Sequence, residues 1–276
     1  MKKLICLISF IALLGTYTNL NAQTTKTWVG ITSAWGTASN WSPSGVPASI
    51  DHIVITSGTP LLDANRSVKN ITVSGGTVNL NGFTLTITGT TSLSAGTVNS
   101  GIISFSNTTT TFSGTTFGSV VTVSAQNINF NGSIFNGNVT ATKTASGTNT
   151  STGANTFNGT LDLRVNAGEI ALNPSGGTKN AYNNNVQVST TGSGILGFGG
   201  TGNQLASGKT ITIGSGGWAA GTLKFTAFEQ LGTTAQTLTL TGTTTILEFG
   251  SGNTWAGKLT VSAPIIKFNG ATFSKR

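Results

Sequence analysis

The chain has 276 residues, with 14 Lys and Arg against 6 Asp and Glu and a formal net charge of +8. Only 7% of the residues are charged, whereas about 25% is usual in soluble domains, and Gly, Thr, Ser and Asn replace them. Most lysines lie too far apart to form the basic cluster that follows a phosphate backbone, which argues against nucleic acid as a partner; they include Lys69, Lys143, Lys179, Lys209, Lys224, Lys258 and Lys267.

Residues 1–22 have the three parts of a secretory signal peptide. Lys2 and Lys3 precede an apolar run from Leu4 to Leu14, and small and polar residues follow up to Ala22. The apolar run has about 11 residues, whereas about 20 are needed to span a bilayer. We therefore predict cleavage near Ala22, a secreted or cell-surface protein, and no insertion into the membrane. The only cysteine, Cys6, lies in this leader, so disulfides, thiolate metal sites and cysteine nucleophiles are excluded from the mature chain.

Residues 23–56 form a Trp-rich module that differs from the rest of the chain. Trp28, Trp35 and Trp41 lie close together and precede Asp51 and an alternating apolar segment. We predict that the module caps the first coil of a repeat structure, whose sheet edge and apolar core would otherwise be exposed. The alternative is that the three indoles form a platform on which sugars stack. Asp51 is interpreted as a turn carboxylate that accepts backbone amides, in preference to a metal ligand.

The order of these residues resembles a known family. Trp28-Val-Gly30, Trp35-Gly36, Asn40-Trp41-Ser42, Val46-Pro47 and Asp51 follow one another as in the start of the large adhesin-like β-repeat proteins of Bacteroidota. The resemblance implies a right-handed parallel β-helix on a secreted or cell-surface protein, in many members exported by the type IX system. Such proteins often carry a carboxy-terminal sorting domain. This chain instead stops in mid-coil at Ser274-Lys275-Arg276, which favours a chain cut from a longer one.

Residues 57–276 repeat whole phrases at a short period. Gly76-Thr-Val-Asn79 recurs as Gly96-Thr-Val-Asn99, and a longer phrase occurs three times, as Phe112-Ser-Gly-Thr-Thr-Phe117, Phe130-Asn-Gly-Ser-Ile-Phe135 and Phe268-Asn-Gly-Ala-Thr-Phe273. Apolar and hydroxyl residues alternate between them, as in β-strands. We predict an all-β parallel β-helix of about a dozen coils in one continuous domain, with strands about 4.8 Å apart. An antiparallel sandwich is the alternative, although sandwich strands rarely repeat their sequence.

Two less regular segments interrupt this pattern. Residues 142–155 consist mostly of Thr, Ser, Gly and Asn, and residues 173–185 combine Pro174 and Gly176 with a run of Asn. Both are predicted to be loops that project from a coil.

The acidic residues do not form the pairs that catalysis on a β-helix requires. The closest grouping is Asp162, Arg164 and Glu169, and Asp162 and Arg164 share one face of a strand, which predicts a surface ion pair. His52 points to the opposite face from Asp51, so no nucleophile and base come together. We predict no catalytic residue, metal ligand or cofactor, with Asp51, Asp162 and Glu169 as the weak carboxylate candidates.

Thr-x-Thr rows occur at Thr84, Thr86 and Thr88 and again at Thr237, Thr239 and Thr241. Such rows order water on ice-binding faces when they stack across coils, but Thr also suits any solvated β-face. Because adjacent coils do not repeat the rows in register, ice binding is the minor alternative. The main hypothesis is a secreted, non-catalytic structural or adhesive scaffold that presents loops to glycans or other cells. A polysaccharide lyase or hydrolase is the competing hypothesis.

Overall fold

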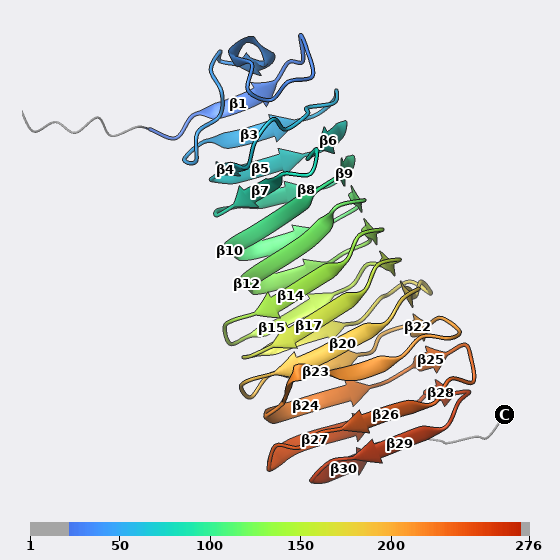
Figure 1. The fold of residues 1–276 in the computed structure, drawn as a ribbon. Coiled ribbons are helices and arrows are strands. Elements are labelled where there is room, and N and C mark those ends of the chain that lie inside the picture. The colour runs from blue at the N-terminus through green and yellow to red at the C-terminus, as the bar shows by residue number, and fades with distance from the viewer. Residues whose placement is uncertain (1–21, 272–276) are drawn as a thin grey trace, which may run out of the picture.

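The computed structural model describes residues 22–271. They form a parallel β-helix of about 10 turns, stacked along one axis from β1 to β30 (Figure 1). The predicted fold class is therefore confirmed, including the Trp-rich cap at the amino-terminal end. The predicted signal peptide lies outside the described residues apart from Ala22, and so does Phe273 of the third repeated phrase. No helix within 22–271 has the length and apolar character needed to cross a bilayer.

Within residues 22–271, four sheets make up the walls. The first sheet contains β1 (Thr25–Trp28), β2 (Trp41–Ser42), β3 (His52–Ile55), β4 (Arg66–Val68), β5 (Asn70–Val73), β7 (Thr84–Ile87), β8 (Thr91–Leu93), β10 (Ile102–Phe112), β12 (Val120–Phe130), β14 (Val139–Lys143), β17 (Leu161–Val165), β20 (Val186–Thr190) and β23 (Ile211–Trp218). The second contains β6 (Thr77–Asn79), β9 (Thr97–Asn99), β11 (Thr116–Phe117), β13 (Ile134–Phe135), β16 (Thr156–Phe157), β19 (Asn180–Tyr182), β22 (Asn203–Leu205), β25 (Phe228–Gln230) and β28 (Thr254–Trp255).

The third sheet contains β15 (Thr148–Ser151), β18 (Glu169–Leu172), β21 (Ile195–Phe198), β24 (Ala220–Phe225), β27 (Thr244–Phe249) and β30 (Ile265–Phe268). The fourth pairs β26 (Gln236–Thr239) with β29 (Leu259–Ser262), and a short 3-10 helix, η1, spans Ala38–Asn40. All pairings except β1 with β2 are parallel, which excludes the sandwich alternative.

The turns lengthen from the early to the middle part of the stack. The pairs Phe117 with Phe135 and Phe135 with Phe157 are 18 and 22 residues apart, and Phe157 pairs with Tyr182 after 25 residues. The 11-residue strands β10 and β12 each cover two walls, and β10 pairs with both β7 and β8 of the preceding turn. Later turns divide the same path into two strands, as in β17 and β18. These longer turns place fewer coils in the stack than the constant period of the early repeats predicts.

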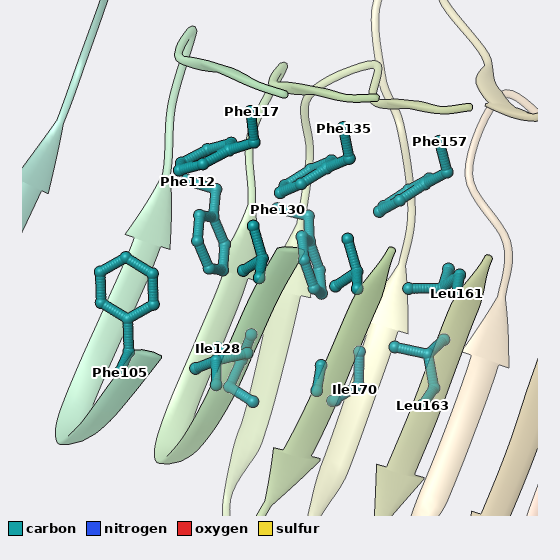
Figure 2. Packing of buried hydrophobic residues seen from close by; sticks show 14 of the residues in the cluster. Phe105, Phe112, Phe117, Ile128, Phe130, Phe135, Phe157, Leu161, Leu163 and Ile170 are labelled. Carbon is teal, nitrogen blue, oxygen red and sulfur yellow. The ribbon is translucent and has the colours of Figure 1, made fainter. Parts of the chain in front are cut away.

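The repeated phenylalanine phrase fills the same place in successive turns. Phe112 stacks on Phe130 and Phe117 on Phe135, with ring centroids 5.3 Å and 5.2 Å apart (Figure 2). The glycine inside each phrase has a positive φ, 81° at Gly114 and 89° at Gly132, which other residues rarely adopt. Each of these two phrases therefore specifies one bend between two walls and places two rings in the core.

The segment 142–155 is not a projecting loop. Thr148–Ser151 forms β15, which pairs in parallel with β18, and the side chains of Lys143, Asn149 and Ser151 are buried. The prediction was wrong because it took polar residues as a sign of a loop. In this segment, hydrogen-bonding side chains occupy inward positions that apolar residues usually fill. The second predicted loop is confined to residues 174–179, since Asn180–Tyr182 forms β19.

Asparagine side chains line one inner corner of the stack. Asn155, Asn180 and Asn203 are fully buried at corresponding positions of three turns. Asn155 Nδ2 donates to Asn180 Oδ1, and Asn180 Nδ2 donates to Asn203 Oδ1, both at 2.9 Å. Asn253 occupies the same kind of bend two turns later and donates to the Phe225 carbonyl at 3.1 Å. Asn155 and Asn203 likewise donate to the carbonyls of Phe130 and Leu172, so these amides satisfy buried backbone groups at the corner.

Candidate functional site

A polar groove lies on the outer face of the first sheet, across β14, β17, β20 and β23. One part of it is a hollow of about 290 Å³ lined by Thr142, Asp162, Arg164, Asn166, Gln187, Ser189, Thr191, Gly214, Ser215 and Gly216. A second hollow of about 320 Å³ shares Asp162 and Gln187 and is further lined by Thr160, Leu161, Asn185, Val186, Thr210 and Thr212. These two shared residues connect the hollows, and the two together are called the groove.

The groove results from an irregularity in β23. Val188 pairs with Ile213, but Thr190 pairs with Trp218, so β23 contains three more residues than β20 between these pairs. The extra residues form a bulge that includes Ser215, Gly216 and Gly217. The floor is open because Gly214 has no side chain, and a Cβ there would lie 3.2 Å from Gln187 Cγ. Bulges of this kind commonly re-aim side chains beside binding sites.

Asp162 and Arg164 form the ion pair that was predicted. Both point outward from β17, and Arg164 Nη2 and Nε lie 2.5 Å and 2.9 Å from Asp162 Oδ2. The hydrogen bond to Asp162 raises the pKa of Arg164. Arg164 therefore keeps its positive charge beside the Asp162 carboxylate, and the two charges offset each other.

The structure separates the third member of the predicted grouping. Glu169 belongs to β18 in the third sheet, where its carboxylate accepts a hydrogen bond from Thr148 Oγ1 at 3.2 Å. It lines a small hollow of about 70 Å³ with Gly197 and Lys224, not the groove. Asp162 and Glu169 thus lie on different walls.

The other carboxylates are engaged elsewhere. Asp51 accepts the backbone amides of Thr24 and Ala48 at 3.1 Å and 2.8 Å, as expected for a turn carboxylate. The remaining three form ion pairs: Asp63 with Arg66, Glu229 with Lys179, and Glu248 with Lys224. The hydrogen bond from Arg66 lowers the pKa of Asp63. Residues 22–271 contain no group of three or more His, Asp or Glu side chains that could hold a metal ion.

The three tryptophans of the cap face one another. Trp28, Trp35 and Trp41 are buried, and Trp41 meets Trp28 and Trp35 edge-to-face at centroid distances of 5.0 Å and 4.7 Å. Trp41 Nε1 donates to the carbonyl of Trp35 at 2.8 Å. A sugar needs an open indole face on which to stack, so this geometry favours the cap over the sugar platform.

Sequence reasoning missed a buried lysine directly behind the groove. Lys143 follows Thr142 in β14 and points inward, where Nζ donates to the Gln126 carbonyl and to Asn149 Oδ1, both at 2.6 Å. Burial lowers the pKa of Lys143. No sequence signal marks it, because a lysine between threonines resembles a surface residue.

Lys143 predicts how stability depends on pH. A lysine whose pKa is lower in the folded than in the unfolded state binds fewer protons when folded, so the free energy of unfolding rises as pH approaches 10.5. Burial raises the pKa of Tyr182. This makes the free energy of unfolding fall with rising pH, but only above the ordinary tyrosine pKa of 10.0. Denaturant unfolding from pH 7 to about 9.5 should therefore show rising stability. The Lys143→Met variant should lose this rise, and an unchanged rise would contradict the assignment.

Outward hydroxyls form two columns beside the groove. Thr86, Ser104, Thr122 and Thr140 pair in register on β7, β10, β12 and β14, and Asp162 follows them. Ser106, Ser124 and Thr142 form the second column, which leads to Arg164. The Thr-x-Thr row itself is not repeated in register, because Thr84 is followed by Ile102 and Val120. With Ser at several positions, however, hydroxyls continue the Thr86 position across four strands.

The groove and the columns belong to the same face, because both are formed by strands of the first sheet. Comparison of the chain with family models, curated proteins and solved structures returns no match.

Proposed function

We propose that the protein is a secreted or cell-surface adhesive scaffold, without catalytic activity, whose β-helix presents a polar face to glycans or to other cells. The observation that carries the proposal is the groove around Asp162 and Gln187, which is open to solvent and lined by hydrogen-bonding side chains. Its single carboxylate is bound to Arg164 and has no second acid beside it. Hydrolysis of a glycosidic bond uses two carboxyl groups on either side of that bond.

The stack itself supports a scaffold role. Every turn between the cap and β30 pairs in parallel with its neighbours, and the aromatic rings stack from turn to turn inside. Such a repeat gains its stability from neighbouring turns and offers an extended surface. Export remains a prediction of the leader sequence.

The test is to add the purified protein, lacking residues 1–22, to cells and to immobilised polysaccharides. Association with either supports adhesion, whereas a protein that stays dispersed and binds no glycan or matrix contradicts it. The enzymatic alternative is tested on the same polysaccharides. Oligosaccharide release that Asp162→Ala or Glu169→Ala abolishes would establish an enzyme in place of a scaffold.

The two hydroxyl columns favour a second candidate function, ice binding. Pairing in register sets neighbouring hydroxyls about 4.8 Å apart between strands and about 6.6 Å apart along a strand. This is a regular two-dimensional array of the kind that orders water. Four successive strands contribute to it, from Thr86 on β7 to Thr140 on β14.

If this array binds ice, the protein should cause thermal hysteresis and inhibit ice recrystallisation. Thr122 lies at its centre, so Thr122→Lys should abolish both effects. Thr156→Lys is the matched control, because Thr156 is a similarly half-buried strand residue on the second sheet. Absence of both effects in the unmodified protein would end this alternative.

A further inference from the structure

We propose that the groove binds a neutral, hydroxyl-rich glycan chain that lies along the axis of the β-helix, across β14, β17, β20 and β23. This inference rests on the proposed adhesive function and specifies the chemical class and orientation of its ligand. Three properties of the groove carry it: its charge, its lack of exposed rings, and its direction.

The charge of the groove argues for a neutral ligand. Asp162 and Arg164 are the only ionised side chains in its lining, and they are bound to each other. A uronate or sulfated glycan would need cations that are free to pair with it. Here it would have to compete with Asp162 for Arg164, at the cost of leaving that carboxylate without its partner.

The lining consists of groups that hydrogen-bond to hydroxyls. Gln187 is exposed and its carboxamide makes no hydrogen bond within residues 22–271, so both its donor and its acceptor are available to a ligand. Thr142, Ser189 and Thr212 add hydroxyls around it. No aromatic residue lines either hollow, which makes hydrogen bonds the main source of recognition.

The strands that line the groove suggest the orientation. Both hollows cross β17, β20 and β23, and the first one also reaches β14, so a linear chain that follows the axis of the stack meets four successive strands. Four strands at about 4.8 Å span about 14 Å, which fits several sugar units and exceeds a single one. Repeating hydroxyls of a linear chain would then meet successive turns.

The experiment titrates the protein with two sets of probes by calorimetry. One set contains neutral oligosaccharides of increasing length, based on glucose, mannose, xylose and galactose; the other contains oligogalacturonate and heparin fragments. We expect binding of at least one neutral chain, with affinity that rises from monosaccharide to tetrasaccharide. This affinity should be the same within about twofold at 0.05 M and 0.5 M NaCl, because no net charge is paired.

Two variants place the binding in the groove. Gln187→Ala should weaken binding about tenfold through the loss of its hydrogen bonds. Gly216→Val should abolish it by filling the groove; Gly216 is exposed, and a Cβ there lies 3.5 Å from Ser189, an ordinary contact. Gln126→Ala is the matched control, because Gln126 is an exposed glutamine on β12 outside the groove, and it should leave binding unchanged.

Binding that is confined to the acidic probes, or that falls steeply with salt, would overturn the neutral class. Neutral binding that survives both groove variants would overturn the site. If no neutral probe binds while the protein still attaches to cells, this inference fails and the adhesive function stands. If the unmodified protein attached neither to cells nor to any glycan or matrix, the adhesive function itself would be overturned.

Discussion

Replacing Trp41 with alanine is expected to lower the free energy of unfolding by about 3–5 kcal/mol. Its side chain is 1% exposed and lies between Trp28 and Trp35, so alanine leaves a large cavity in the cap. The change also removes the donor to the Trp35 carbonyl. Because β2 covers the outer edge of β1 through Trp41 and Trp28, loosening the cap should expose that edge.

Denaturant unfolding and light scattering at rising protein concentration measure the two effects. Trp41→Phe keeps a ring in the cap, so it should be less destabilising than alanine and should remain monodisperse. Val29 follows Trp28 in the sequence and is 51% exposed, so Val29→Ala should change the free energy of unfolding by no more than about 0.5 kcal/mol. A Trp41→Ala protein as stable and dispersed as the wild type would show that the indole cluster does not hold the cap together.

The architecture could be predicted from the sequence because each turn repeats the same local requirements. A glycine at a positive φ followed by a ring, as at Gly114 and Phe117, specifies one bend, and its recurrence at Gly132 and Phe135 specifies a stack. The number of turns was harder to predict. The number of turns depends on how many residues form each later corner. The sequence does not show this, because those corners contain Asn and Gly without a repeated phrase.

The groove could be predicted only in part. The spacing of Asp162 and Arg164 places them on one strand face, and the ion pair follows from that. The distance between Asp162 and Glu169 along the chain does not reveal that a corner separates their walls. Nor does the sequence show the register shift opposite Thr190, which depends on how Trp218 reaches the core. Polar residues that point inward, such as Lys143, are likewise hidden, because composition alone assigns them to the surface.

The inner asparagines carry the second large expected effect. Asn180 Oδ1 accepts both the backbone amide and the side-chain amide of Asn155, each at 2.9 Å, and its own Nδ2 donates to Asn203. Asn180→Leu keeps the size of the side chain but provides neither donor nor acceptor. It leaves the Asn155 backbone amide buried without a partner, which costs about 1–3 kcal/mol, and the lost side-chain bonds raise the total to about 2–4 kcal/mol.

The matched control is Asn158→Leu, in a second asparagine column on the outside of the same corner. Asn158 Nδ2 donates to Asn136 at 2.7 Å and Asn183 donates to Asn158 at 2.7 Å, but these side chains are exposed, so water replaces the lost bonds. Its free energy of unfolding should change by about 0.5 kcal/mol or less. Hydrogen exchange of the Asn155 amide should accelerate in Asn180→Leu alone. Equal effects of the two variants would mean that burial does not distinguish the columns, and the stability of this corner would then come from its backbone pairing.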